Sequence, residues 1–168
     1  MNRKPAAYDR RTVLRTTGTL LATGALAGCL GGDGEEGDDA GSGDEYERVP
    51  EEEEPDYEGW FDTTGNYEGT ADGRGESEVG VAVGAGDRGY AFEPAAVMVE
   101  LGTTVVWEWT GSGGGHNVVE EDETFGDDEI HTEEGHTYEH TLEEPGTYRY
   151  VCTPHDTQGM RGAIVVEE

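Results

Sequence analysis

The stretch Tyr148–Met160 constrains this chain more than any other, because it places three kinds of metal-binding side chain close together. Cys152, His155 and Met160 follow one another as Cys-x-x-His-x-x-x-x-Met. Two of these side chains are soft sulfur donors, which suit copper far better than magnesium or calcium. A lone Cys, His or Met more often packs a core or lies on the surface. The three at this spacing, behind a Tyr-x-Tyr-x-Cys strand, predict a metal site.

A copper site made of a Cys, a His and a weakly bound Met needs one more His. The candidate is His116, which stands far upstream in Gly-Gly-Gly-His-Asn. Side chains alternate along a strand, so Cys152 shares one face with the two tyrosines before it and points into the fold. We expect tertiary folding to bring His116, Cys152, His155 and Met160 around one copper ion that alternates between Cu(I) and Cu(II). The thiol is deprotonated when it binds the metal.

An upstream His116 followed by this Cys-x-x-His-x-x-x-x-Met motif resembles the plastocyanin-like blue-copper cupredoxins, over roughly residues 76–168. The resemblance implies a type 1 copper electron-transfer protein rather than an enzyme. Its partners would be redox proteins in the membrane, with no small-molecule substrate, and it would act as a monomer. The alternative function is a copper-binding lipoprotein for copper delivery or storage.

The resemblance also implies roles for residues near the four ligands. Asn117 would tie the His116 turn to the loop after Cys152, and Pro154 would stiffen that loop. Val151 stands where plant plastocyanins carry a Tyr used in docking. Electron transfer through the exposed edge of His155 is therefore expected instead.

The folded part has a hydrophobic period of two and no useful helical stripe, which predicts strands. Val105, Trp107 and Trp109, for example, share one face of a strand that follows a turn at Gly102. We expect an all-β Greek-key sandwich of seven or eight strands, in a copper domain spanning residues 59–168. The expected strands cover 78–83, 90–100, 103–109, 116–119, 136–142, 147–152 and 160–166, with a polar loop at 121–135 that has room for a short edge strand or a helical turn.

Residues 1–28 have the features of an export signal rather than of a folded segment. Asp9–Arg15 resembles a twin-arginine motif, and a short apolar run follows that is too rich in Gly and Thr to span a membrane. The run ends in Leu-Ala-Gly-Cys, which resembles a lipobox. We expect cleavage before Cys29, lipidation of its thiol, and a location on the outer face of the cell membrane.

Residues 29–58 consist mainly of Gly and acidic residues and are predicted to form a disordered tether behind the lipid anchor. The whole chain is acidic, with 39 Asp and Glu against 10 Lys and Arg and a formal net charge of −29. Such a charge excludes nucleic acid as a partner, because phosphates would repel it. Since acidic residues also occupy the predicted strands, we expect adaptation to concentrated salt, which screens self-repulsion.

Other metal-site classes fit less well. Cys29 and Cys152 are the two cysteines of the chain, and no disulfide between them is expected. A binuclear copper centre needs two cysteine ligands, and only Cys152 is available once Cys29 carries lipid. Multicopper oxidases need His-x-His pairs, which the sequence lacks. His136-Thr-Tyr-Glu-His140 matches a zinc-protease motif, but that motif requires a helix, and its Thr and Tyr residues favour a strand. We therefore expect His140 to be a half-buried packing residue and His131 to lie in a surface loop.

Overall fold

The computed structural model describes residues 46–168. The predicted export signal, Cys29 and the first part of the predicted tether lie outside the described residues. Within the part that is described, no helix is long and apolar enough to cross a membrane.

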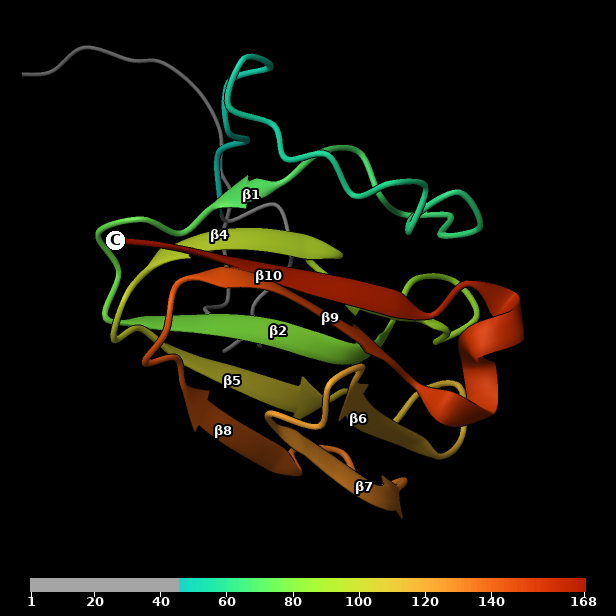
Figure 1. Ribbon diagram of the computed structural model, residues 1–168. Coiled ribbons are helices and arrows are strands. Elements are labelled where there is room, and N and C mark those ends of the chain that lie inside the picture. Colours follow the sequence, from blue (N-terminus) through green and yellow to red (C-terminus); the bar gives the residue numbers. More distant parts are fainter. Residues whose placement is uncertain (1–45) are drawn as a thin grey trace, which may run out of the picture. The chain divides into compact units, whose positions relative to one another are not determined.

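Two β-sheets form the domain (Figure 1). The larger sheet has the strand order β1 (Ala71–Asp72), β4 (Ala96–Glu100), β10 (Arg161–Glu167), β9 (Gly146–Val151), β6 (His116–Glu120), β7 (Gly126–His131). The smaller sheet has the order β3 (Ala91–Glu93), β2 (Glu78–Ala85), β5 (Thr104–Trp109), β8 (Thr137–Thr141). The chain passes between the sheets repeatedly, for example from β5 to β6 and from β8 to β9, so residues distant in sequence meet at the ends of the sandwich.

The predicted all-β sandwich is confirmed, but the described residues contain ten strands rather than seven or eight. The expected strand 90–100 is two strands, β3 and β4, which belong to different sheets. They separate at Pro94, which has no N–H to continue a ladder. β7 forms inside the predicted polar loop by pairing with β6, and the two-residue β1 pairs with β4.

The core lies between the two sheets and is built from the inward faces of their strands. β5 shows the predicted alternation, since Val105, Trp107 and Trp109 are buried and the residues between them are half-buried. Trp107 packs edge-on against Tyr150 of the opposite sheet, with ring centroids 5.5 Å apart. Burying side chains of this size contributes roughly 2–3 kcal/mol each. Cys152 and Met160 belong to the same buried cluster, so the two predicted sulfur ligands are part of the core.

Residues 46–58, which were predicted as the end of the disordered tether, pack onto the domain instead. Val49 and Tyr57 are buried, and the backbone N–H of Val49 donates to the carbonyl of Thr70 at 2.9 Å. Tyr57 packs with Phe61 and with alanines of β4 and β10 in a second hydrophobic cluster. The acidic composition of this segment concealed its few apolar side chains, and these find partners only on the folded sandwich.

Candidate metal centre

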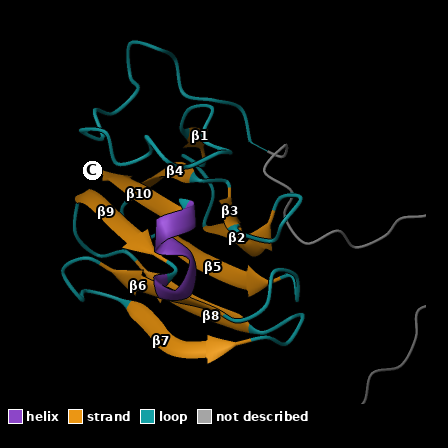
Figure 2. Ribbon diagram, turned by 90° about the vertical axis from the view of Figure 1, so that its right-hand side faces the viewer, coloured by secondary structure: helices purple, strands orange, loops and turns teal. Residues whose placement is uncertain are grey.

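The loop between β9 and β10 carries three of the four predicted ligands at one end of the sandwich. Cys152 follows β9 directly and caps a short 3-10 helix, η2 (Thr153–Gln158), with Pro154 in its first turn. In Figure 2 this helix lies in front of the strands, at the end of the sandwich that faces the viewer. The helix ends at Gly159, which has a φ of +83° that favours glycine. The chain therefore turns back, and Met160 returns to the level of Cys152.

Backbone hydrogen bonds hold this loop in a compact form. The N–H of His155 donates to the carbonyl of Cys152 at 3.0 Å, and the N–H of Met160 donates to the carbonyl of His155 at 3.2 Å. The N–H of Cys152 donates to the carbonyl of Met160 at 3.1 Å. The three residues are thus linked to one another, which fixes their spacing independently of any metal.

Three donor atoms converge at this end of the sandwich. Sγ of Cys152 lies 3.5 Å from Nδ1 of His116 and 3.4 Å from Nδ1 of His155, and the two nitrogens are 3.1 Å apart. Three such ligands in a plane around one first-row metal ion, at bond lengths near those known for zinc, would be about 3.5–3.8 Å apart. The observed triangle is only slightly smaller. One Cys thiol and two imidazoles that converge in this way are a set of donors that would hold a copper ion.

A backbone carbonyl selects the tautomer of His116. Nε2 of His116 lies 2.8 Å from the carbonyl oxygen of Ser112. A carbonyl can only accept, so Nε2 carries the proton and Nδ1 presents its lone pair toward Cys152 and His155. Such hydrogen bonds to the far nitrogen commonly orient metal-binding imidazoles. Sequence reasoning missed Ser112, because a contribution from the main chain leaves no residue signature.

The electrostatics of the site favour neutral ligands before metal binding. Burial lowers the pKa of both His116 and His155, so each imidazole is available as a neutral donor. Burial raises the pKa of the Cys152 thiol, and hydrogen bonds from the backbone of Asn117 and His155 oppose this rise. The thiol therefore keeps its proton until a cation displaces it, and the two backbone groups are in place to stabilise the resulting thiolate.

Met160, the predicted fourth ligand, and Asn117, the predicted supporting residue, both lie buried near the three donors. Met160 is fully buried and lies in the same core cluster as Cys152. Asn117 is buried next to His116 in β6, and its Oδ1 accepts a hydrogen bond from the backbone N–H of Thr153 at 2.8 Å. Its amide nitrogen donates to the Thr153 hydroxyl at 2.9 Å. Asn117 thus links the strand of His116 to the loop that holds Cys152.

His155 is the donor that reaches the surface. His116 and Cys152 are at most 1% exposed, whereas His155 is half-buried. The ring of Tyr90, from the loop before β3, stacks on His155 with centroids 4.3 Å apart and an angle of 24°. Tyr90 was not among the predicted site residues, because nothing in its local sequence pattern marks a contact with His155, which is distant in the sequence.

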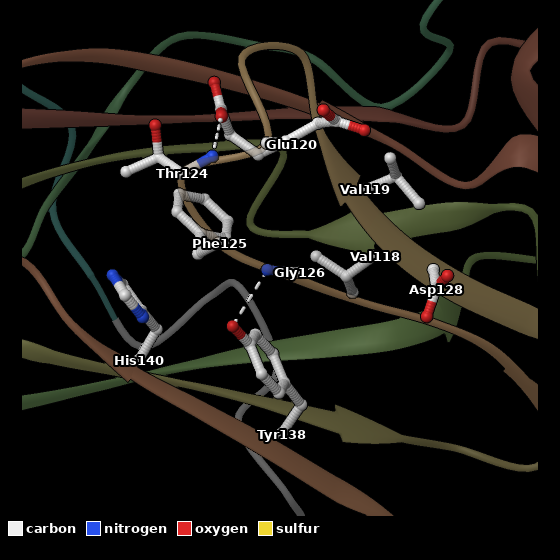
Figure 3. A pocket seen from close by; sticks show the side chains of 10 residues that line it. Val118, Val119, Glu120, Thr124, Phe125, Gly126, Asp128, Tyr138 and His140 are labelled. Carbon is white, nitrogen blue, oxygen red and sulfur yellow. Dashed lines mark hydrogen bonds between the residues drawn. The ribbon is translucent and has the colours of Figure 1, made fainter.

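The zinc-protease motif forms a strand rather than a helix from its second residue on, and His136 precedes the strand. Thr137–Thr141 forms β8, and its exposure alternates, so His140 lies on the same face as Tyr138. His140 stacks on Phe125 with centroids 5.1 Å apart. Both residues line a pocket of ≈ 450 Å³ in which Tyr138 accepts a hydrogen bond from the N–H of Gly126 (Figure 3). The two histidines of the motif do not share a metal cluster, and the expected packing role of His140 agrees with this position.

The expectation for His131 was wrong. It is the last residue of β7 rather than a surface loop residue, and its side chain is only 20% exposed. Its imidazole stacks on that of His136, with centroids 3.7 Å apart. The error arose because β7 is an edge strand of acidic composition, and the hydrophobic pattern alone could not identify it.

The fold and the cluster of donors define a cupredoxin. The model of the plastocyanin/azurin family of copper-binding proteins matches residues 79–167, and the chain belongs to this family. It is 44% identical over 170 residues to halocyanin of Natronomonas pharaonis, an alignment that covers 95% of this chain and 98% of that protein. These similarities confirm the predicted copper cofactor and a blue-copper electron-transfer family of carriers rather than enzymes.

Relatives of lower identity align with about half of this chain. Chloroplastic plastocyanin of Pisum sativum is 35% identical over 99 residues, covering 52% of this chain and 58% of that protein. Among solved structures, oxidised plastocyanin from Dryopteris crassirhizoma has 24% sequence identity and a TM-score of 0.44, covering 53% of this chain and all of that chain.

Proposed function

We propose that this protein is a membrane-tethered shuttle that carries single electrons between respiratory membrane complexes. The observation that supports the proposal most directly is the convergence of Cys152 Sγ with the Nδ1 atoms of His116 and His155, all within 3.5 Å of one another. These atoms would hold the copper ion, and the thioether of Met160 would be a weak fourth ligand. Bound copper would supply a one-electron couple.

The residues around the donors would keep them in place when the charge of the site changes. The Ser112 carbonyl orients His116, and Asn117 ties β6 to Thr153. The backbone bonds within the loop maintain the spacing of Cys152 and His155. Because these contacts do not depend on the metal, little has to move on oxidation or reduction, and a low reorganisation cost suits electron transfer.

We place the contact with redox partners at the surface edge of His155. The other proposed ligands are buried, so a partner approaching them would be separated from the site by protein. Val151 is half-buried beside the loop, at the position where plant plastocyanins carry a docking Tyr. Tyr90 covers one face of the His155 ring and would form part of the surface that a partner meets.

The membrane tether rests on the N-terminal sequence, which lies outside the described residues. The Leu-Ala-Gly-Cys29 segment and the preceding twin arginines support export followed by lipidation. The described residues begin at Tyr46, and the first of them already pack onto the domain. The tether at the outer face of the membrane would therefore lie between Cys29 and Tyr46.

The experiment that tests the shuttle against copper delivery or storage is voltammetry of the copper-loaded protein combined with metal analysis. A shuttle should give a reversible one-electron wave and keep one copper per chain in both oxidation states. A copper-delivery protein should lose copper in one oxidation state to a competing chelator. Loss of copper on reduction would therefore contradict the proposed role.

We expect substitutions of Met160 to shift the reduction potential without removing copper. Gln would offer a harder oxygen donor that favours Cu(II), so Met160→Gln should lower the potential. Leu would remove the donor, so Met160→Leu should raise it. Shifts on the order of tens of mV are readily measured, since about 59 mV corresponds to a tenfold change for a one-electron couple.

Met98 provides the matched control for this series. It is equally buried but belongs to β4, so Met98→Leu should leave the potential unchanged. A different order of reduction potentials from the expected one (the Leu variant highest, the wild type next, the Gln variant lowest) would contradict the assignment of Met160 as a weak fourth ligand, and so would loss of copper from Met160→Leu.

We expect mass spectrometry of the mature protein to show a chain that begins at Cys29 and carries additional lipid mass. Cys29→Ser removes the thiol that would accept the lipid, so this variant should appear in the medium with its copper site intact. Recovery of an unmodified Cys29 from membranes would argue against the anchor and would leave the copper site unaffected.

A further inference from the structure

A second group of metal-binding side chains lies apart from the copper site. It consists of Asp127 and His131 at the two ends of the β7 region and His136 just before β8, and the ligand atoms of the three lie within 4.8 Å of one another. Nε2 of His131 is 3.0 Å from Oδ2 of Asp127, and Nε2 of His136 is 3.2 Å from the same oxygen. Two imidazoles therefore meet one carboxylate oxygen.

The Asp127 carboxylate is oriented for this contact. Its other oxygen, Oδ1, accepts a hydrogen bond from the backbone N–H of Glu129 at 3.3 Å. This bond leaves Oδ2 facing His131 and His136. Burial raises the pKa of Asp127, but the hydrogen bond from His136 and the close approach of His131 outweigh it, and the net pKa lies below its ordinary value. The carboxylate is consequently ionised at neutral pH.

The hydrogen bonding of this group is incomplete. Within the described part of the chain, the buried Nε2 of His131 has no hydrogen bond of good geometry, although it lies close to Asp127. A buried polar atom without a hydrogen-bond partner lowers the stability of the fold. A cation bound among the three side chains would provide that partner: with both imidazoles in the tautomer protonated at Nδ1, each Nε2 would give the cation a lone pair in place of an N–H directed at Asp127.

A buried tryptophan packs against the two imidazoles, and the three side chains of the group are also partly exposed to solvent. Trp109, which is 1% exposed, packs edge-on against both imidazoles, with centroids 4.7 Å from His136 and 5.7 Å from His131. The side chains of Asp127, His131 and His136 are themselves 19–27% exposed. An ion can thus enter from solvent and retain a water molecule as a further ligand.

We propose that Asp127, His131 and His136 bind one divalent transition-metal ion of the zinc class, in addition to the copper ion of the cupredoxin site. Two imidazoles, one carboxylate and a water match the ligands that Zn²⁺ accepts in open four-coordinate sites. Ligand atoms at tetrahedral angles around zinc would be about 3.3 Å apart. The Nε2 atoms of His131 and His136 lie 3.0 and 3.2 Å from Oδ2 of Asp127, which is close to this value. The absence of sulfur in this group disfavours Cu(I).

The two metal sites are neighbours that share no ligand. His131 is the cross-strand partner of His116 in the pairing of β7 with β6. The indole N–H of Trp109 donates to the carbonyl of His116 at 3.1 Å, while the same ring contacts the second group. Removing the second site should therefore be possible without touching any atom proposed to bind copper.

The test is metal analysis of the copper-loaded full chain after incubation with Zn²⁺ and removal of free ions. Concentrated KCl and excess Mg²⁺ are included, because a chain of net charge −29 attracts divalent cations diffusely. One zinc per chain should remain beside one copper, with the blue colour retained. In the reduced, colourless protein, Co²⁺ should occupy the same site and give visible d–d absorption.

Variants locate the bound ion. His131→Gln combined with His136→Gln should keep copper and colour but lower the zinc affinity by about 100-fold or more. Asp127→Asn, which preserves the shape of the carboxylate, should lower it by at least about tenfold. His140→Gln, on the same β8 region but stacked on Phe125, should retain both ions.

Wild-type protein that retains no zinc, or zinc that is displaced by Mg²⁺, would overturn the proposal. So would a blue double variant that binds zinc as tightly as the wild type. Because the copper content and colour are measured in the same samples, a failure of this second site is distinguishable from a failure of the copper site.

Discussion

Cys152→Ser is expected to abolish the intense blue absorption of the oxidised protein. The colour of a type 1 site requires electron density from a thiolate bound to copper, and Cys152 Sγ is the one sulfur atom in the triangle formed with the two imidazoles. A serine oxygen is harder and smaller and cannot supply that transition. The measurement is the visible spectrum together with the copper content per chain.

Cys29→Ser is the matched control for this substitution, since it replaces the other cysteine of the chain. It should leave the colour and the copper content unchanged. A Cys152→Ser variant that remains blue would contradict the site, and so would zinc in place of copper in wild-type protein from cells supplied with both metals.

Gly159→Ala is expected to destabilise the domain by about 2–4 kcal/mol and to weaken copper retention. Gly159 has a φ of +83°, a conformation in which a side chain is strained. A Cβ at this position would also overlap the carbonyl oxygen of Thr63, which belongs to the main chain and cannot rotate away. Relieving the overlap would displace the loop that ends at Met160.

The effect of this substitution can be measured by urea unfolding of the copper-free domain and by copper loss to a chelator. Gly65→Ala is the control, because Gly65 is exposed and a Cβ there would meet nothing within 4 Å. The urea midpoint of the Gly65→Ala variant should be nearly the same as that of the wild type. Equal urea midpoints for the Gly159 and Gly65 variants would show that the close approach of Gly159 to Thr63 does not contribute to stability.

The sequence alone was sufficient to predict the class of the protein. The spacing of Cys152, His155 and Met160 is set within one loop, so local sequence determines it, and period-two patterns such as that of β5 report burial on one face of a sheet. These short-range signals led to an all-β copper protein, which the fold and the family similarity confirm. They also placed the protease-like motif on a strand.

Tertiary structure alone decided the features that depend on contacts between distant segments. The packing of Val49 and Tyr57, the stacking of Tyr90 on His155 and the meeting of His131 with His136 all join residues whose own neighbourhoods carry no signal. The tautomer of His116 depends on a carbonyl group, which every residue possesses. Sequence patterns report the burial of side chains along one segment, whereas the partner of a side chain or a backbone group is chosen only when two segments are brought together.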